Sequence, residues 1–250
     1  MRAAILALAL VAAADLAHAI DGEAADDDEP PAKAGRISYK FTPTWYGTTN
    51  QPGAFDLNLR GNLGAHVAWV GYYRQPGRFN QARAGYEYTF EFPAGRATPS
   101  LQAAGHGFVG ASLSGELGGR HFALAGVGRT NLKPYFNLNF DPNDAVLLGA
   151  GTRAIRDTVL QLYQIRDDRL RTGQRVLHFV ARARPDERSR WTVDIFHKRG
   201  RLSAEDEDLR RGTGLSVTYD FGPHFVRAAA DPHVNFGREH MLRLALGTRF

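Results

Sequence analysis

The chain has 250 residues, of which 43% are hydrophobic and 23% charged, a composition that fits either a globular domain or a membrane barrel. It contains no cysteine, so no disulfide holds the fold together. The formal net charge is +5, and the residues after 36 hold 28 basic and 19 acidic side chains, a net charge of +9. After Ala19 there is no run of the roughly 20 apolar residues that a transmembrane helix needs, so any membrane crossing must use strands.

The N-terminal segment carries an export signal. Arg2 supplies a positive charge, residues 3–14 form an apolar run, and Ala17-His18-Ala19 is a small-x-small cleavage site. These features predict a signal peptide over 1–19 and a mature chain that begins at Ile20. Residues 21–31 then carry six acids and two prolines with no aromatic residue, and we expect residues 20–36 to form a disordered acidic tail.

Alternating segments of about ten residues begin at Ile37 and continue to the end of the chain. In each of them apolar residues occupy every second position, which is the periodicity of a strand. The clearest examples are residues 82–92, 109–117, 177–183, 191–198, 215–221 and 242–250. Most connections carry tight-turn residues, whereas residues 166–174 and 200–212 are longer and charged, and this mixture predicts a barrel with a short-turn end and a long-loop end.

The two faces of these strands differ in a way that favours a membrane barrel over a soluble sandwich. One face is apolar and aromatic near strand ends, and the other combines small and ionisable residues, as in a crowded lumen. Strands can cross lipid only in a closed barrel. We therefore predict an all-β fold over 37–250, a transmembrane antiparallel up-and-down β-barrel of about 12 strands, with 14 as the alternative. Two joints leave the number open, because residues 101–117 and the segment around Pro134 each read as one strand or two.

The last ten residues, MLRLALGTRF, are an amphipathic strand that ends on an aromatic residue. With the export signal, the alternating strands and the absence of cysteine, this strand resembles the closing strand of bacterial outer-membrane β-barrel proteins of the small, porin-like kind. The resemblance implies that Leu242, Leu244, Leu246 and Phe250 form the assembly signal. It also implies a place in the cell outer membrane, and the outer-membrane assembly machinery, periplasmic chaperones, membrane lipids and lipopolysaccharide as partners.

Strand parity predicts which charged residues face the lumen. The inward bases are Arg83, Arg182, Lys198, Arg227, Arg243 and Arg249, and the inward acids are Glu87, Glu91, Glu116, Asp194, Asp220 and Asp231. Charges in a narrow interior must be paired or wetted, so we expect a network of ion pairs, with a diagonal pair between Asp220 and Arg227 that Arg243 completes. The two signs balance, which argues against a strongly anion-selective pore.

Two classes of function remain open. We predict a small porin or channel, or a structural envelope protein, with a salt-bridged lumen; the alternative is a lipid-modifying outer-membrane enzyme of the phospholipase or lipid A deacylase type. The nearest approach to a nucleophile and base is His106 with Ser112 and Ser114, which parity places on the lumen side, away from lipid. His197 lies on the lipid face, without a serine or carboxylate beside it in the sequence. An enzymatic role is therefore the less favoured one.

The remaining motifs predict no bound cofactor. DPND, residues 141–144, lacks the ligand spacing of a calcium loop and is typical of a turn, and neither a metal cluster nor a phosphate-binding loop occurs. Nothing indicates a nucleic-acid partner, and we expect a monomer. The excess arginines lie in or beside connections, where they either form a solvated surface or bind lipopolysaccharide phosphates. They are Arg166, Arg169, Arg171, Arg184, Arg188, Arg190, Arg199, Arg201, Arg210 and Arg211.

Overall fold

The computed structural model describes residues 36–133, 135 and 144–250, so the predicted signal peptide and nearly all of the predicted acidic tail lie outside the described residues. Antiparallel strands dominate the described part of the chain. In the first half they are β1 (Ser38–Thr48), β2 (Ala54–Leu63), β3 (His66–Gln75), β4 (Phe79–Tyr88), β5 (Phe90–Phe92), β6 (Gly95–Ala104), β7 (Phe108–Gly118) and β8 (His121–Thr130). In the second half they are β9 (Ala145–Thr152), β10 (Thr158–Asp167), β11 (Arg175–Asp186), β12 (Ser189–Gly200), β13 (Arg210–Phe221), β14 (His224–Asp231) and β15 (Met241–Arg249).

Two single-turn 3₁₀ helices, η1 (Gly105–Gly107) and η2 (Val234–Phe236), complete the described elements. Among these residues no helix is long and apolar enough to cross a membrane.

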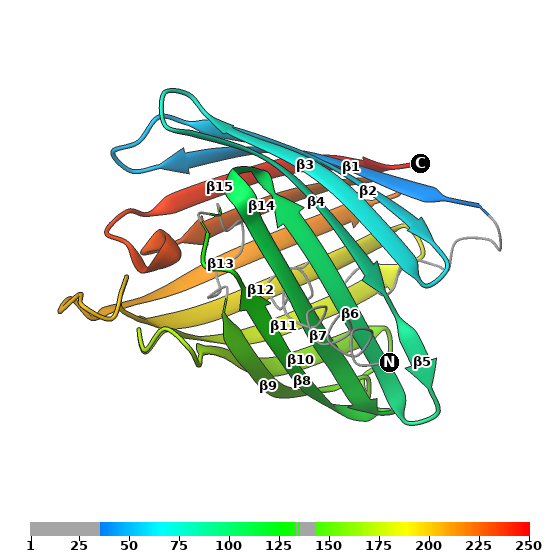
Figure 1. The fold of residues 1–250 in the computed structure, drawn as a ribbon. Coiled ribbons are helices and arrows are strands. Elements are labelled where there is room, and N and C mark those ends of the chain that lie inside the picture. Colours follow the sequence, from blue (N-terminus) through cyan, green and yellow to red (C-terminus); the bar gives the residue numbers. More distant parts are fainter. Residues whose placement is uncertain (1–35, 134, 136–143) are drawn as a thin grey trace, which may run out of the picture.

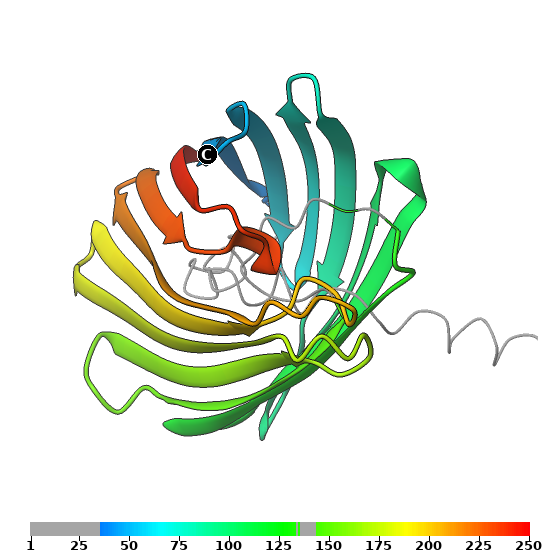
Figure 2. The same cartoon turned by 90° about the vertical axis from the view of Figure 1, so that its left-hand side faces the viewer.

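The sheet closes on itself. Each strand pairs with its neighbours in sequence, and β1 also pairs with β15, from Lys40 opposite Arg249 to Thr48 opposite Met241. β4 and β5 are two parts of one strand, interrupted at Thr89, because both pair with β6. The result is a closed antiparallel barrel of 14 strands, seen from the side in Figure 1 and toward one end in Figure 2. The pairing of the last strand with the first confirms that MLRLALGTRF closes the barrel.

The alternative count of 14 is confirmed, and the favoured count of 12 is wrong. Residues 95–118 form two strands, β6 and β7, joined by the three-residue turn of η1. His106 makes this turn in the left-handed region, with φ of 68°. On the second doubtful joint, β8 ends at Thr130 and β9 begins at Ala145, and residues 134 and 136–143 between them lie outside the described residues.

The two ends of the barrel have the predicted asymmetry. At the end that holds the start of β1 and the end of β15, five of six connections contain two residues and the sixth, 153–157, contains five. At the opposite end the connections contain three to 14 residues. We call these the short-turn end and the long-loop end. Both termini of the barrel meet at the short-turn end, where Tyr39 and Phe250 exchange two backbone hydrogen bonds of 2.8 and 2.9 Å.

Large inward aromatic rings lie directly opposite glycines on neighbouring strands. Trp69 on β3 faces Gly85 on β4, and its ring occupies the space that a Cβ on Gly85 would take, at 2.4 Å. The same arrangement recurs in three further pairs, Phe122 with Gly151, Phe196 with Gly214, and Phe225 with Gly247. Each ring is almost fully buried. Glycine therefore provides the room that lets bulky rings lie against the inner wall.

Candidate pore lining

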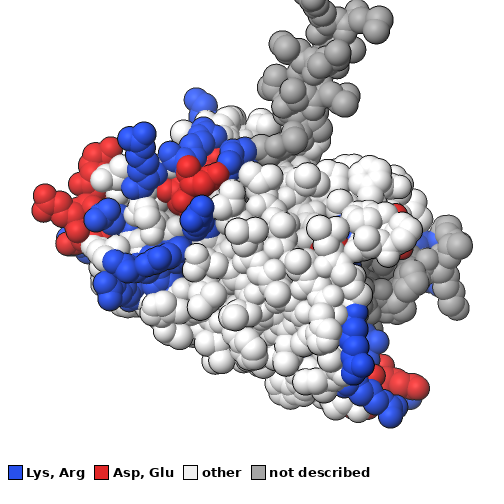
Figure 3. All heavy atoms as spheres, turned by 90° about the horizontal axis from the view of Figure 1, so that it is seen from below, with Lys and Arg blue, Asp and Glu red and all other residues white. Residues whose placement is uncertain are grey.

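The outside of the barrel is apolar between two charged rims. On β2, Phe55 and Leu57 expose 60% and 49% of their surface, while Asp56 between them is buried. Figure 3 shows the same pattern over one side of the molecule, as a broad uncharged band with basic and acidic residues at its two ends. Exposed apolar surface of this extent is stable only against lipid or another apolar phase. The band therefore marks the part of the barrel that faces the membrane core.

Aromatic rings collect on this outer face near the short-turn end. Trp191 and Tyr219 stack at 4.4 Å between ring centroids, and Tyr219 continues to Phe221 at 5.7 Å. Phe250 stacks on Tyr39 at 5.7 Å. Rings at this position match the aromatic girdle that lies at headgroup level in membrane barrels.

Most of the charged residues that parity assigned to the lumen are inside. Nine of the twelve are buried: Arg83, Glu87, Glu116, Asp194, Lys198, Asp220, Arg227, Asp231 and Arg243. Arg182 and Arg249 are half-buried. Glu91 is exposed, contrary to the prediction, because it lies in β5, which pairs with β6 alone and has no strand on its other side.

At the short-turn end each inward acid contacts arginines from other strands. Glu116 binds Arg96 at 3.0 Å and Arg153 at 2.7 Å, so that β6, β7 and the residue after β9 are tied together. Asp220 binds Arg190 at 3.2 Å.

The same carboxylate, Asp220, also binds Arg249 of the closing strand at 2.7 Å, and Glu87 binds Arg60 at 3.1 Å. Five arginines thus contact three carboxylates. Arg182 lies nearby, in the lining of a cavity of about 260 Å³ that it shares with Arg153 and Arg190. At this end arginines therefore outnumber the carboxylates that they contact, and Arg60, Arg96, Arg153 and Arg190 were not among the predicted lumen residues.

The predicted diagonal pair between Asp220 and Arg227 does not form. Arg227 donates from Nε to Thr218 Oγ1 at 3.0 Å and lies near the Phe225 ring, whereas both arginine partners of Asp220 come from β12 and β15. The partners of Asp220 are therefore Arg190, directly opposite it on the neighbouring β12, and Arg249 on β15, two strands away, and neither lies on β14.

Deeper in the barrel the charges occur as closely packed pairs. Asp56 contacts Arg83, and Lys198 contacts Asp231, with side chains that are at most 3% exposed. His178 lies 3.0 Å from Asp194 and stacks on Tyr163 at 4.8 Å, and its ring is buried. Asp56 and Arg60 could have been identified from the alternation in AFDLNLR, since both occupy the face opposite Phe55, Leu57 and Leu59.

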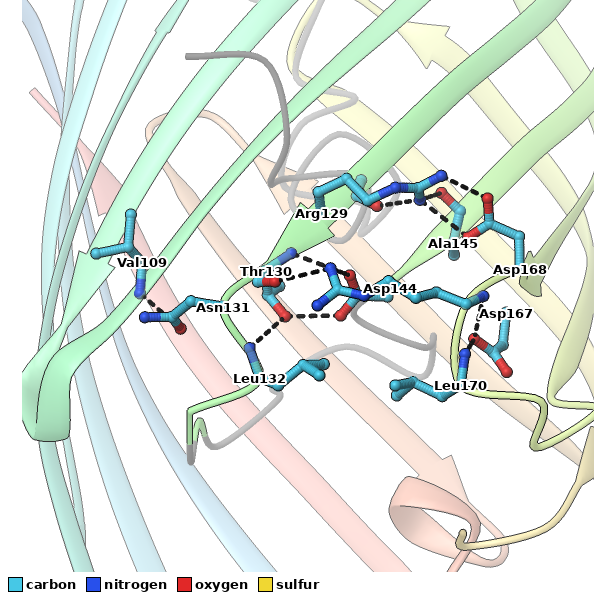
Figure 4. Close-up of polar contacts among 12 residues, drawn as sticks. Val109, Arg129, Thr130, Asn131, Leu132, Asp144, Ala145, Asp167, Asp168 and Leu170 are labelled. Atoms are coloured by element: carbon cyan, nitrogen blue, oxygen red, sulfur yellow. Dashed lines mark hydrogen bonds and ion pairs between the residues drawn. The ribbon is translucent and has the colours of Figure 1, made fainter. Parts of the chain in front are cut away.

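The long-loop end carries a second network, drawn in Figure 4. Asp144 accepts hydrogen bonds from Thr130 N and Oγ1, at 3.1 and 2.6 Å, and pairs with Arg169 at 2.9 Å. Arg129 forms a two-pronged pair with Asp168, at 2.9 and 2.5 Å. These contacts fasten the 168–174 loop to the ends of β8 and β9. Asp144, the last residue of DPND, thus has a structural partner in an arginine, while the rest of the predicted turn, 141–143, lies outside the described residues.

Within the described residues, the candidate catalytic groups do not assemble. His106 is in the η1 turn, exposed, with its ring stacked on Phe79, so it does not lie on a strand as parity suggested. Ser112 is buried and its hydroxyl lies 3.4 Å from that of Ser100. His197, on the lipid face, contacts Thr213 Oγ1 at 3.0 Å and neither a serine nor a carboxylate.

A closed antiparallel barrel with an apolar outer band, an aromatic girdle and a charged interior is a transmembrane β-barrel of the outer-membrane type. Solved structures of that type have the same fold. The outer membrane protein Omp33 of Acinetobacter baumannii aligns over 87% of this chain and 100% of its own, with a TM-score of 0.55 and 10% identity.

Two further porin structures align less closely. A mutant of the Rh. blastica porin covers 86% of this chain and 99% of its own, with a TM-score of 0.48 and 7% identity. The KdgM porin in complex with disordered oligogalacturonate covers 84% and 99%, with a TM-score of 0.45 and 9% identity. At such identities the likeness extends to the fold alone. No protein-family profile and no curated protein sequence matches the chain.

Proposed function

We propose that this protein is a porin-type channel of the outer membrane, exported by its signal peptide and active as a monomer. The observation that carries the proposal is the contrast between the two faces of one closed sheet. The outer face exposes Phe55 and Leu57, and the inner face carries Asp56 from the same strand. A barrel whose only task was to fill membrane area would be stabilised equally well by an apolar interior, since buried ion pairs add little net stability. Charged inner walls are useful where ions and polar solutes pass.

The arginines at the short-turn end lead us to propose small anions as the solutes. Five arginines share three carboxylates there, and the arginine side chains of Arg153 and Arg190 remain partly accessible, at 38% and 13%. Guanidinium groups that outnumber the carboxylates they contact attract anions and raise the barrier for cations. Guanidinium groups also match carboxylate and phosphate oxygens in geometry.

Planar-bilayer recording tests this proposal. We expect steady single-channel openings and, in a salt gradient, a reversal potential of the sign that reports anion preference. Arg153→Gln/Arg182→Gln should move the reversal potential toward zero. Arg120→Gln/Arg188→Gln removes the same charge from exposed turns of the same end, outside the cavity that Arg153 and Arg182 line, and should leave it unchanged.

A silent barrel would overturn the channel proposal. If that silent barrel released fatty acid from phospholipid or lipid A, the lipid-modifying alternative would replace it; without such activity, the structural envelope role would. Openings with cation preference would retain the channel and refute the solute class.

The closing strand supports a second part of the proposal. Leu242, Leu244, Leu246 and Phe250 are all exposed on the outer face, at 45%, 46%, 64% and 66%. We propose that this face is the segment that periplasmic chaperones and the outer-membrane assembly machinery recognise before the barrel inserts.

A further inference from the structure

Four arginines form a continuous row across adjacent strands at the long-loop end. Arg166 on β10 lies opposite Arg175 on β11, which lies opposite Arg199 on β12, which lies opposite Arg211 on β13. Cross-strand neighbours are about 4.8 Å apart, so this arginine row spans about 14 Å. The register, and not the spacing in the sequence, brings the four residues together.

The arginine row faces outward, and no acid of the described residues pairs with it. Arg166, Arg175 and Arg211 are exposed and Arg199 is half-buried, while Lys198 beside Arg199 points inward and is buried. Within the described part of the chain none of the four forms an ion pair. In Figure 3 basic residues crowd the edge of the uncharged band at this end of the barrel.

Three nearby acids are engaged elsewhere, and Glu205 and Glu207, which the structure also describes in the 201–209 loop, form no ion pair with the row. Asp167 accepts hydrogen bonds from the backbone N–H groups of Leu170 and Thr172, at 2.8 and 3.0 Å. Asp206 and Asp208 in the 201–209 loop both pair with Arg210, whose hydrogen bond lowers the pKa of the Asp206 carboxyl.

Like charges directly opposite one another destabilise a sheet. In the arginine row, like charges face one another in three consecutive strand pairs. A surface in contact only with water gains nothing from such repulsion. An external polyanion that contacts several guanidinium groups at once would remove the repulsion, since arginine binds phosphate oxygens through two parallel hydrogen bonds.

The residues between the arginine row and the middle of the barrel become progressively less polar. Two residues further along each strand, about 7 Å away, the outward positions form a mixed row: Gln164, Leu177, His197 and Thr213. Two residues beyond, they form an exposed apolar row: Leu162, Phe179, Ile195 and Leu215. This order of charge, mixed polarity and hydrocarbon matches the phosphate, linkage and acyl layers of a membrane lipid.

We propose that the arginine row binds the phosphate groups of an anionic glycolipid in the outer leaflet, of the diphosphorylated lipid A type. A row of four guanidinium groups is long enough to contact two phosphates of one lipid, with the acyl chains lying on the apolar row below. The inference rests on the proposed outer-membrane location and on an orientation with the long loops toward the outer leaflet, as in outer-membrane barrels generally, and it is independent of channel activity.

Native mass spectrometry of the purified barrel in a neutral detergent tests the site, with diphosphoryl lipid A as the probe. We expect one lipid to stay bound, and binding to weaken by about tenfold or more in Arg175→Gln/Arg199→Gln, because each charged hydrogen bond contributes substantially. Arg156→Gln/Arg188→Gln makes the same change of charge on exposed turns at the short-turn end and should bind as the wild type does. A gel-mobility shift on heating verifies that each variant is folded.

Three further probes identify the source of the phosphate. Monophosphoryl lipid A should bind more weakly, and inorganic phosphate and phosphatidylglycerol should compete poorly. Equal binding by the wild type and Arg175→Gln/Arg199→Gln overturns the proposal. So does equal competition by inorganic phosphate or by phosphatidylglycerol, which would reduce the row to an unspecific anion surface. Conductance stays the same in all these outcomes, so a failure here is distinct from a failure of the channel proposal.

Discussion

Replacing Asp220 with asparagine tests how dry the barrel interior is at the short-turn end. The Asp220 carboxylate joins Arg190 on β12 to Arg249 on β15, at 3.2 and 2.7 Å. The three side chains are only 8%, 13% and 16% exposed. Asparagine keeps the shape of the side chain but removes the negative charge that both guanidinium groups contact.

The magnitude follows from the burial of the cluster. At an effective dielectric constant of about 20, two unit charges 4 Å apart interact by about 4 kcal/mol. Part of this is recovered because the carboxylate no longer has to be desolvated, so we expect Asp220→Asn to lower the free energy of unfolding by about 3 kcal/mol, as is usual when one partner of a buried pair is removed. In a water-filled interior the same change would cost less than about 1 kcal/mol.

Urea unfolding in lipid vesicles, followed by tryptophan fluorescence, measures this difference. The control is Asp157→Asn, which breaks a pair with Arg156 of similar length, 3.1 Å, whose side chains are 58% and 95% exposed. Arg249→Gln supplies a second arm, since Arg190 still neutralises Asp220 and the loss should be smaller. Equal unfolding midpoints for Asp220→Asn and Asp157→Asn would refute the reasoning and show that water screens the cluster.

Two further predictions concern packing. Gly85→Ala should lower the free energy of unfolding by about 1–3 kcal/mol, because the new Cβ would lie 2.4 Å from the Trp69 ring. Gly115→Ala is the control and should change the free energy of unfolding little, since the atom nearest to its Cβ would be 3.4 Å away. Equal urea midpoints for the two variants would contradict this prediction. Phe250→Ala should slow barrel assembly, because it removes the terminal aromatic ring and its stack on Tyr39. The rate is measured as the fraction of protein with heat-modifiable gel mobility over time. An unchanged rate would contradict the assembly role of Phe250.

The alternation in the sequence was sufficient to predict the barrel, its closure and which face of most strands is charged. The number of strands was harder to predict, for a geometric reason. The turn at residues 105–107 contains an odd number of residues, so Ala103 and Val109, which pair across it, keep the same parity. An uninterrupted strand has the same parity, and only the backbone conformation of His106 distinguishes the two.

The partners of the charged residues could not be predicted from the sequence. Asp220 and Arg227 lie on adjacent strands and seemed close enough to pair, yet Asp220 pairs with Arg190 on its other neighbouring strand and with Arg249, two strands away. Which side chains meet across a lumen depends on strand tilt and stagger, which no local pattern encodes. The arginine row was missed for the same reason, since Arg166 and Arg211 are 45 positions apart and meet only through the register of the strands between them.

The pairs of inward rings and glycines have a consequence for how the barrel assembles. A slip of one residue between strands turns the wrong face inward, but a slip of two preserves the faces and leaves the alternation intact. After such a slip Trp69 would meet Arg83 or Glu87 in place of Gly85, and a bulky charged side chain leaves no space for the indole. Each ring therefore fits only opposite its glycine. The ring–glycine pairs destabilise hairpins with a two-residue slip, which the hydrophobic pattern alone does not distinguish from the correct register.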